Sequence, residues 1–371
     1  MIEKLEYWWR HYIVYPILRL IFHNPRKDSP IDIQTIDSLL FLRYDRIGDM
    51  IVTTPILRSL KQLKPTLKIG VFASETNAEI IRYNPYVDAI YVLHSNWIRL
   101  IAEILKARKN KYAVVLNFIF NRTTSGGILA NIISPSGIKI GQGDEKYRFY
   151  FNRLLKVSRK YSHMIETLVF IIKETFNIKL IPGQLKYDIF IDEKTKNNVA
   201  TYLTKYNLRP RQYSTSGKSS YVVFNLSAND SVRRISAEQA YAIGNHLGLK
   251  TSFRTLLLHA PNDSLMLSIK QELVKNSRCI SFPEQQNASL LEVAAIIEGA
   301  IAVITPDTSI IHFASATKTP VIGFYTQMQD VHEWLPHQVM NRVVISFKNE
   351  PTSAIPNQKM LNAIDDFIRE L

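Results

Sequence analysis

Charged side chains gather directly after an apolar run near residue 40. The run Ser38–Leu42 is followed by the letters RYDRIGD and then by apolar residues at helical spacing. Loops between a buried strand and a helix often carry function, because the flanking elements hold them rigidly. In such a loop, Asp49 can accept a proton as a general base or can cap the helix, and the residues alone leave both roles open.

The same loop places Asp45 between Arg43 and Arg46. A carboxylate flanked by two guanidinium groups is expected to form an ion pair that supports the loop. Asp45 is therefore the second candidate for the base. The two arginines are also candidates to contact phosphates or acidic sugars, and Gly48 is expected to let the backbone turn tightly after the strand.

A second group of polar residues, Asp307, Thr308, Ser309 and His312, follows an apolar run that ends at Pro306. Asp307 or Thr308 is a suitable N-cap, and the first free amides of a helix attract anions. Asp307 itself would repel an anion, so we expect it to cap the turn or to bind a sugar hydroxyl. His312 lies one turn into the helix, either as a ligand contact or as a packed histidine bonded to a carbonyl.

A third group lies between a strand and a helix in the letters NLSANDSVRRISAEQ. Asn225 and Ser227 end the strand, and Arg233 and Arg234 precede Ser236, a predicted N-cap. Paired arginines in such a loop can donate two-pronged hydrogen bonds to a diphosphate. The alternative is a solvated basic loop.

Strand-like and helix-like segments alternate from residue 38 to the C-terminal helix, and the predicted strands are almost continuously apolar. That pattern predicts parallel sheets covered by helices on both faces. The polar stretch 209–220 has linker composition, and the alternation restarts after it. We therefore expect an α/β chain of two doubly wound domains that face each other across a cleft, with domains at 29–208 and 209–371 after an N-terminal segment at 1–28.

The segment 1–28 mixes tryptophan and tyrosine with arginine and lysine, and its uncharged runs are too short for a spanning helix. No small-residue cleavage site follows, so we expect no signal peptide. Aromatic residues with cationic neighbours are typical of an amphipathic helix at the headgroup level. The alternative is a helix that packs on the protein's own body or on a partner chain. Pro16 predicts a kink or a break into two short helices.

The chain has 371 residues and a formal net charge of +14. Nucleic acid, an anionic membrane and phosphate-bearing substrates are the usual partners of such a charge. No aromatic RNA-binding signature, zinc spacing or long basic block occurs, which excludes nucleic acid and favours an anionic membrane surface with phosphorylated substrates. A single cysteine, Cys279, excludes a disulfide framework and a cysteine-rich metal site, and it suits a reducing cytosol.

Three stretches together resemble the family 9 glycosyltransferases, the ADP-heptose:lipopolysaccharide heptosyltransferases and their relatives. They are RYDRIGDMIVTTPILRSLKQLKP, NPYVDAIYVL and ITPDTSIIHFASATKTPVIGFY. The resemblance runs from about Ser38 to the C-terminal helix. It implies a GT-B fold with two Rossmann-like domains, the acceptor on the first and the nucleotide-sugar on the second, and a metal-independent, inverting transfer with no cofactor.

The resemblance also implies roles for the residues. Asp49 becomes the catalytic base, and Arg43, Arg46 and Gly48 become acceptor-side residues. The donor side comprises Asn225, Ser227, Arg233, Arg234, Asp307, Thr308, Ser309 and His312. Arg233, Arg234 and the helix start would supply positive charge to the departing diphosphate.

This chain departs from the family pattern on the donor side. Ser309 stands where the family usually has a glycine, and Arg233 to Ser236 replace a lysine before Trp-Pro. His259 to Pro261 replace a glycine-rich turn. These changes leave the identity of the donor open.

The leading hypothesis is a cytoplasmic enzyme, peripheral on the inner membrane, that transfers a sugar, heptose by family precedent, from a nucleotide-sugar such as ADP-heptose to a lipid-linked glycan. The second is a non-catalytic relative that binds sugar-nucleotide or glycan within a synthase complex. A dinucleotide-dependent oxidoreductase or epimerase is disfavoured, because Arg-Ile-Gly-Asp and not Gly-x-Gly-x-x-Gly follows the first strand.

Overall fold

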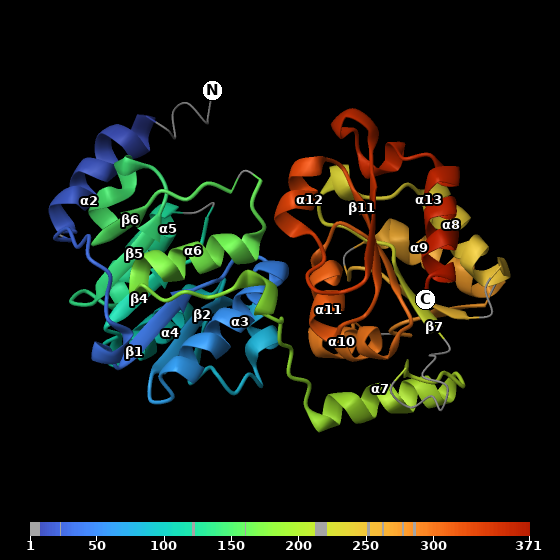
Figure 1. Ribbon diagram of the computed structural model, residues 1–371, viewed down its shortest axis with the longest axis horizontal. Coiled ribbons are helices and arrows are strands. Elements are labelled where there is room, and N and C mark those ends of the chain that lie inside the picture. Colours follow the sequence, from blue (N-terminus) through green and yellow to red (C-terminus); the bar gives the residue numbers. More distant parts are fainter. Residues whose placement is uncertain are drawn as a thin grey trace. The chain divides into compact units, whose positions relative to one another are not determined.

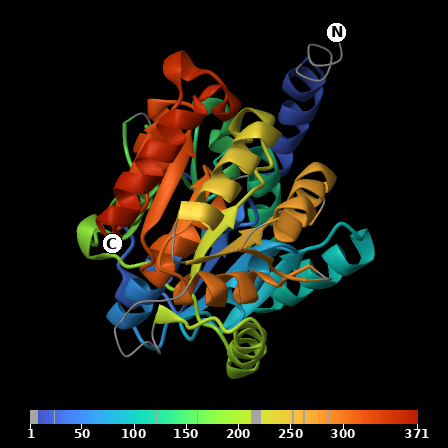
Figure 2. The same cartoon turned by 90° about the vertical axis from the view of Figure 1, so that its right-hand side faces the viewer.

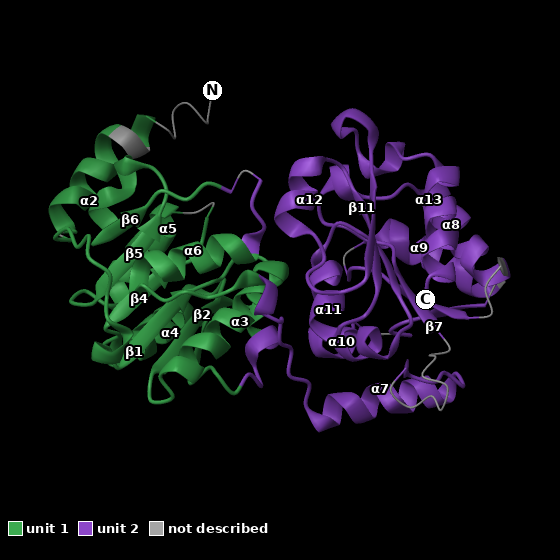
Figure 3. Ribbon diagram, viewed as in Figure 1, with its two compact units in different colours: residues 1–78, 85–158, 165–182 green, residues 79–84, 159–164, 183–371 purple. Residues whose placement is uncertain are grey.

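The computed structural model describes residues 8–22, 24–120, 123–159, 161–211, 221–250, 253–261, 263–276, 278–284 and 287–371. The chain divides into two compact units (Figure 3). Unit 1 comprises residues 1–78, 85–158 and 165–182, and unit 2 comprises residues 79–84, 159–164 and 183–371. The polar stretch 209–220, where we place a domain boundary, falls within unit 2, and residues 212–220 lie outside the described part of the chain. The boundaries at 28 and 208 stay predictions.

Unit 1 is built on a six-stranded parallel sheet with the strand order β3-β2-β1-β4-β5-β6. Within it, Leu39 of β1 is in register with Ile69 of β2 on one side and with Val114 of β4 on the other. The strands are β1 (Ser38–Leu42), β2 (Lys68–Ser74), β3 (Ala89–Leu93), β4 (Val114–Asn117), β5 (Ile138–Gln142) and β6 (Arg153–Leu155).

Helices cover both faces of this sheet, which is why its strands read as apolar runs. Leu40 and Leu42 of β1 join a buried cluster with Ala107 of α4 and Ala130 of α5, while α3 and α6 lie on the opposite face (Figure 1). The helices of unit 1 are α2 (Tyr15–Ile21), α3 (Ile47–Leu63), α4 (Trp97–Lys109), α5 (Thr123–Ile133) and α6 (Met164–Phe176).

Unit 2 repeats the topology of unit 1. Its parallel sheet has the order β12-β11-β10-β7-β8-β9, which is the same arrangement when its strands are numbered from β7. The strands are β7 (Tyr221–Asn225), β8 (Arg254–Leu258), β9 (Cys279–Ser281), β10 (Val303–Pro306), β11 (Val321–Tyr325) and β12 (Asn341–Ile345). The helices are α7 (Glu193–Lys205), α8 (Ala237–Lys250), α9 (Ser264–Asn276), α10 (Leu290–Gly299), α11 (Ser309–Thr317), α12 (Met328–Trp334) and α13 (Asn357–Arg369).

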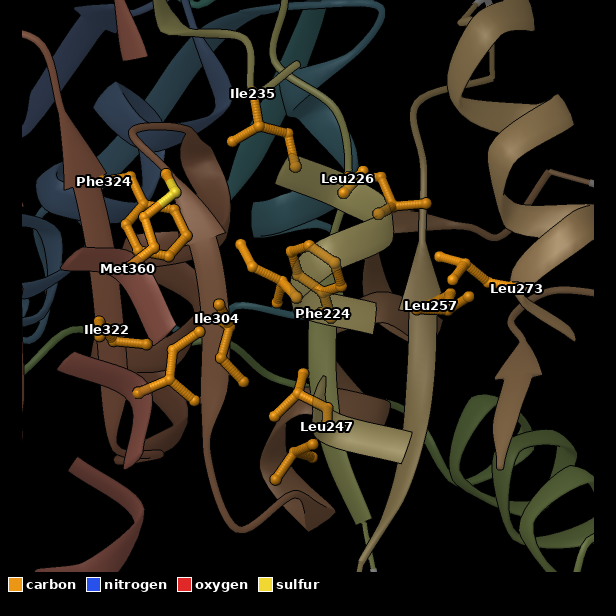
Figure 4. Packing of buried hydrophobic residues seen from close by; sticks show 14 of the residues in the cluster. Phe224, Leu226, Ile235, Leu247, Leu257, Leu273, Ile304, Ile322, Phe324 and Met360 are labelled. Carbon is orange, nitrogen blue, oxygen red and sulfur yellow. The ribbon is translucent and has the colours of Figure 1, made fainter. Parts of the chain in front are cut away.

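The core of unit 2 centres on β7, whose Phe224 is fully buried (Figure 4). Leu247 of α8, Leu273 of α9 and Met360 of α13 belong to the same cluster. The C-terminal helix α13 packs beside α8 in both views of the chain (Figures 1 and 2). The prediction of two doubly wound parallel-sheet domains is therefore confirmed unit by unit.

Short helical turns complete the described chain. They are η1 (Arg10–Val14, a π-helix) and the 3-10 turns η2 (Ile33–Thr35), η3 (Asn77–Ile81), η4 (Glu145–Tyr150), η5 (Pro182–Gln184), η7 (Ser231–Arg233), η8 (Phe347–Asn349) and η9 (Thr352–Ala354). Residues 1–7 of the predicted amphipathic segment lie outside the described residues. The rest forms η1 followed by α2, with Pro16 in the first turn of α2, as the position of the proline predicts.

The N-terminal helices use only part of their apolar surface within unit 1. Tyr15 is buried, and its hydroxyl lies 3.2 Å from Oγ1 of Thr124 on α5. Large side chains of the same segment, Trp9, Ile17 and Leu20 among them, are exposed. The segment therefore packs on the protein's own body and also presents apolar groups to its surroundings. No helix in the described part of the chain is both long enough and apolar enough to cross a membrane.

Candidate functional site

Both sheets reverse their strand order beside their first strand, between β1 and β4 in unit 1 and between β7 and β10 in unit 2. In open α/β sheets, ligands bind outside the carboxyl ends of the strands at this switch point. The residues singled out from the sequence follow β1, β7 and β10 directly. The fold therefore brings the candidates within each unit to that unit's switch point.

Arg43, directly after β1, is fully buried and organises the loop in unit 1. Its Nη2 donates to Oδ1 of Asp49 at 2.9 Å, and its Nη1 donates to Oδ2 of Asp45 at 3.1 Å. Nε donates to the backbone carbonyl of Asp49 at 3.0 Å, and Nη1 also donates to the carbonyl of Phe118. One guanidinium thus holds both candidate carboxylates, and we revise its predicted role from contacting acceptor to positioning these groups.

The surroundings of Asp45 disfavour the charged form of its carboxyl group. Burial raises its pKa from 3.8 to about 7, although the positive charge of Arg43 opposes that rise and the charge of Asp49 adds to it. Its buried Oδ1 has no hydrogen-bond partner among the described residues. The ion pair expected with Arg43 is present, and the group can hold a proton near neutral pH.

Asp49 lies in the first turn of α3 and is 6% exposed. The N-cap residue of α3 is Arg46, and its side chain makes no capping hydrogen bond. Asp49 lies inside the first turn and is not the N-cap that the sequence allowed. Gly48 is buried inside the helix and does not have the positive φ that a glycine turn would need. The tight turn predicted at Gly48 is therefore wrong, because the chain has already entered the helix there.

Arg46 is exposed at the start of α3, in contrast to Arg43. The loop that carries it is tied down by Asn77, whose Nδ2 donates to the carbonyls of Arg43 at 3.0 Å and of Arg46 at 3.4 Å. An exposed cation on a fixed loop can reach an anionic group of a bound molecule. Arg46 remains the acceptor-side arginine in our interpretation.

In unit 2, Asn225 links the ends of β7 and β10. Its Nδ2 lies 3.0 Å from the carbonyl of Ser227, 3.0 Å from Oγ1 of Thr305 and 3.3 Å from Oγ1 of Thr308. The Oγ of Ser227 accepts a bond from the Ala260 amide at 3.0 Å. Asn225, Ser227 and Thr305 are buried, and these contacts fix the loops around the switch point.

Thr308 is the N-cap of α11, and its Oγ1 accepts from the Ile310 amide at 3.3 Å. This confirms one of the two capping residues that the sequence allows. Ser309 is the first helical residue and is half-buried. The helix start therefore presents the amides of its first turn at the carboxyl end of β10, where an anion is favoured.

The two neighbouring arginines differ in surroundings. Arg233 lies 3.0 Å from Oδ2 of Asp307 and 3.3 Å from Oδ1 of Asp330, both buried acids. Its charge is therefore already balanced, and Asp307 is an ion-pair partner rather than the helix cap. Arg234 is exposed, and its Nε donates to the carbonyl of Ala228 at 2.9 Å. Arg234 is better placed to bind a diphosphate.

His312 is buried on α11, with its ring 5.4 Å from that of Trp334. Burial first of all, and then the nearby His163 and His337, lower its pKa from 6.5 to about 3. The imidazole is neutral at physiological pH and cannot offer positive charge to a phosphate. His312 is thus a packed histidine, as the alternative from the sequence proposes. The carbonyl partner expected for it is not found, because its buried Nδ1 bonds to none of the residues that the structure describes.

Three further residues were not found from the sequence. Asn77 donates to the carbonyls of Arg43 and Arg46, and Asp330 pairs with Arg233. Each of these partners lies far away along the chain, so no local pattern points to it. Asn117 ends β4 at the switch point of unit 1 and is 2% exposed, and its buried Nδ2 has no hydrogen-bond partner within the described part of the chain. A polar residue at the end of an apolar strand was the available signal for Asn117, since the letters VVLN end in one.

His259 follows β8 in the place of the glycine-rich turn. It is half-buried, and burial lowers its pKa from 6.5, assisted by the charge of Lys270. Among the residues that the structure describes, no three His, Cys, Asp or Glu side chains gather closely enough to hold a metal ion.

The chain is similar to known sugar transferases over most of its length. The family model described as Glycosyltransferase family 9 (heptosyltransferase) matches residues 107–364. A putative glycosyltransferase of Haemophilus influenzae is 22% identical over 315 residues, or 81% of this chain and 86% of that protein. Lipopolysaccharide heptosyltransferase 3 of Escherichia coli is 24% identical over 305 residues, or 78% and 83% of the two chains. A match to lipopolysaccharide heptosyltransferase 1 of Campylobacter coli is shorter and spans 48% of that protein.

Solved structures share the fold. A glycosyltransferase of family 9 from Veillonella parvula has a TM-score of 0.73 at 18% identity, covering 93% of this chain and all (100%) of that one. The E. coli heptosyltransferase WaaC with ADP has a TM-score of 0.66 at 19% identity, covering 90% and 97%. These likenesses confirm the predicted GT-B fold class.

Proposed function

The chain belongs to glycosyltransferase family 9 and is a glycosyltransferase, and on that premise we propose that it transfers a sugar from a nucleotide diphosphate to a lipid-linked glycan of lipopolysaccharide or surface polysaccharide. The names of its relatives support heptose as the sugar and lipopolysaccharide as the product. The ADP bound by a structural relative supports an ADP-sugar donor. ADP-heptose is therefore the donor that we propose.

The observation that carries the proposal is the placement of Asp49. Its carboxylate lies near the carboxyl end of β1 and is hydrogen-bonded and ion-paired to the buried Arg43. We propose that this carboxylate takes the proton of an acceptor hydroxyl on unit 1. The hydroxyl oxygen then forms a bond to the anomeric carbon of the donor while the bond from that carbon to the diphosphate breaks on the opposite face. The anomeric configuration inverts, the proton remains on Asp49, and the diphosphate departs with its electron pair.

The departing diphosphate needs positive charge, which we assign to unit 2. The first turn of α11 offers backbone amides with the positive end of the helix dipole, and Arg234 offers an accessible guanidinium. Arg233 supports this loop through its two acidic partners. With these groups in place, we propose a metal-independent transfer that uses no cofactor.

We also propose that the enzyme works as a peripheral protein on the cytoplasmic face of the inner membrane. The charge of +14 and the exposed aromatic and aliphatic residues of the N-terminal helices support attraction to an anionic surface. A lipid-linked acceptor lies in such a surface, so membrane binding would concentrate enzyme and acceptor together.

The proposed base is tested by Asp49→Asn, which preserves shape and removes the proton acceptor. Transfer from ADP-heptose to a lipid-linked acceptor should fall by about 10²–10⁴-fold, the usual contribution of a general base. Binding of ADP, which we place on the other unit, should change by less than about threefold. Asp45→Asn is the matched control. If that variant loses transfer and Asp49→Asn keeps it, Asp45 is the base instead.

The donor is tested by calorimetric titration of the intact protein with ADP, UDP, GDP and CMP, each with and without EDTA. Binding of ADP alone, unchanged by EDTA, supports the proposed donor and the absence of a metal. Binding of another nucleotide contradicts the adenine assignment while leaving the mechanism in place. Sugar-nucleotide binding with no turnover in either the natural protein or Asp49→Asn would favour the scaffold function.

A further inference from the structure

Helix α4 is apolar on two sides, although a helix on the surface of a sheet needs only one. Its inner side packs against the core of unit 1 through the buried Ala107 and the partly buried Leu100 and Ile104. The outer side presents large apolar residues to solvent. They are Trp97, 68% exposed, Ile98, 61%, Ile101, 47%, and Leu105, 53%.

These four side chains form one continuous face, which we call the outer face of α4. At about 100° of rotation per residue they fall within about 100° of the helix circumference. The helix is well fixed at that end, because Asn96 caps it by accepting from the amides of Ile98 at 3.0 Å and Arg99 at 3.1 Å. A contiguous exposed apolar face on a rigid helix marks an interaction surface.

The charges around the outer face are almost all positive. Arg99, Lys106, Arg108 and Lys109 lie on α4, and Glu103 is its single acid, paired with Lys106 at 2.6 Å. Apolar and aromatic residues bordered by cations are typical of helices that lie in the interface of an anionic membrane. The long basic side chains can reach headgroups while the apolar groups enter the acyl boundary.

An apolar groove of about 330 Å³ lies between α4 and α5, on the same side of unit 1. Leu100 and Ile104 line it from α4, and Ile128 and Ile132 line it from α5. The hydroxyls of Tyr44 and Ser125, which also line it, lie 3.2 Å from each other and so satisfy part of their hydrogen bonding locally. A groove of this composition suits a hydrocarbon chain better than a sugar.

The outer face of α4 also has an apolar neighbour beyond α5. The hydroxyl of Tyr15 on α2 reaches Thr124 on α5, so α5 is contacted by α2 as well as by α4. Leu20 of α2 is 86% exposed, and Ile132 of α5, at the rim of the groove, is 39% exposed. Exposed apolar groups thus occur on three helices that are in contact, all within unit 1.

We propose that the outer face of α4, together with the groove beside it, binds the surface of an anionic lipid bilayer. This inference rests on the proposed function, because a lipid-linked acceptor requires a membrane. It adds a second membrane contact to the one proposed for the N-terminal helices. Trp97, Ile101 and Leu105 enter the headgroup boundary, and a lipid chain occupies the groove. The positive charge around the face favours a bilayer over a second copy of this basic chain, because two copies repel each other.

The first test measures sedimentation of the full chain with vesicles of phosphatidylcholine and phosphatidylglycerol, and with vesicles of phosphatidylcholine alone. The double variant Ile101→Ser, Leu105→Ser should lose at least about tenfold in affinity for the anionic vesicles, since it replaces two apolar side chains that would leave water on binding by polar ones. The matched control is Leu249→Ser, Leu265→Ser, which removes side chains that are 79% and 59% exposed in unit 2. The control should bind as the natural protein does.

The second test locates the contact. Cys279→Ser provides a background without cysteine, into which Ile101→Cys, Ile132→Cys or Lys106→Cys is introduced and labelled with an environment-sensitive fluorophore. Nitroxide lipids should quench the label at positions 101 and 132 and leave that at 106 largely unquenched.

Unchanged vesicle binding by the Ile101, Leu105 variant would overturn the proposal, and so would equal quenching at all three positions. A label at position 101 that responds to protein concentration without vesicles would show a second copy on this face instead. Neither assay contains donor or acceptor, so failure here leaves the proposed sugar transfer untouched. Loss of transfer activity would likewise leave the vesicle result standing.

Discussion

Arg43 is the residue on which the proposed base depends. A guanidinium withdrawn from water is stable only when it is paired and hydrogen-bonded, and Arg43 meets this condition through two carboxylates and two carbonyls. Its planar fork also lies over the ring of Phe120, 5.8 Å from the centroid. The same contacts that allow the charge to be buried fix the position of Asp49.

Replacing Arg43 should therefore affect stability and catalysis together. Arg43→Met leaves two carboxyl groups without their buried partner, and we expect the free energy of unfolding in urea to fall by about 3–5 kcal/mol. Arg43→Lys keeps the charge but loses the fork, so among folded molecules kcat should fall more than KM rises. Arg46→Lys, exposed in the same loop, should stay within about 0.5 kcal/mol of the natural protein. Equal effects of the lysine changes at 43 and 46 would contradict the positioning role.

Asp45 predicts a pH dependence of stability. Its pKa is raised from 3.8 to about 7 on folding, chiefly by burial, so the folded protein holds this proton more tightly than the unfolded chain does. The stabilisation is present below the unfolded pKa and is lost as the pH rises toward the folded pKa. Urea denaturation from pH 4 to pH 8 should show the natural protein losing stability relative to Asp45→Asn across that window. A constant difference between the two proteins would show that the raised pKa is wrong.

At the scale of single residues, the sequence predicted neighbours better than it predicted distant partners. The pairing of Arg43 with Asp45 follows from adjacent letters. The hydrogen bond from Arg43 to Asp49 could not be predicted in the same way, because it depends on where the first turn of α3 begins. The pairing of Arg233 with Asp330 joins residues 97 positions apart, and no local pattern reports such a contact.

At the scale of elements, the longer apolar strands were predictable, the edge strand β3 among them, and the short edge strands β6 and β9 were not. β1, β7 and β10 are buried and mostly apolar, which the sequence displays directly. β6 and β9 have three residues each and are too short for any periodicity to appear. The stretch Lys139 to Leu155 has no clear hydrophobic period in its sequence. The structure explains this, because most of β5, a 3-10 turn and β6 follow one another there as short elements of different type.

The start of α11 gives a prediction that belongs to one element. Ser309 occupies the first helical position, where the family usually has a glycine and a diphosphate would press against the backbone. Ser309→Gly should raise the affinity for the nucleotide by about threefold to tenfold, because the side chain no longer limits the approach to the amides. Calorimetric titration with ADP measures the change. Thr308→Ala, which removes the capping oxygen, should instead lower stability by about 1 kcal/mol and weaken binding. A loss of affinity in Ser309→Gly would show that the serine contributes to the site.

At the scale of the whole molecule, the chain repeats one topology in both units and uses the corresponding place in each. The loops after β1 and after β7 both leave the first strand at the switch point, but the first holds two carboxylates, Asp45 and Asp49, on a buried arginine, and the second presents the exposed Arg234. A carboxylate suits proton removal, and arginines suit a departing diphosphate. The proposed division of roles, with proton removal on unit 1 and support of the diphosphate on unit 2, thus follows from the residue types that the two units carry at the same place in one topology.

The proposed membrane attachment would depend on the whole chain, since it combines the net charge with apolar groups on several helices. The N-terminal helices are best removed after Ile21, because Asn24 donates to Asn131 and to the carbonyl of Phe149, each at 2.9 Å, and helps hold the following chain on unit 1. The truncated protein should remain folded and bind anionic vesicles more weakly, and Ile101→Ser with Leu105→Ser in the same protein should weaken binding further. Since surface charges are screened over about 10 Å at 0.1 M salt, added salt should weaken binding of the natural protein and of each variant. If truncation alone abolishes binding, α4 makes no independent contact. If salt has no effect, the positive charge of the chain does not contribute to attachment.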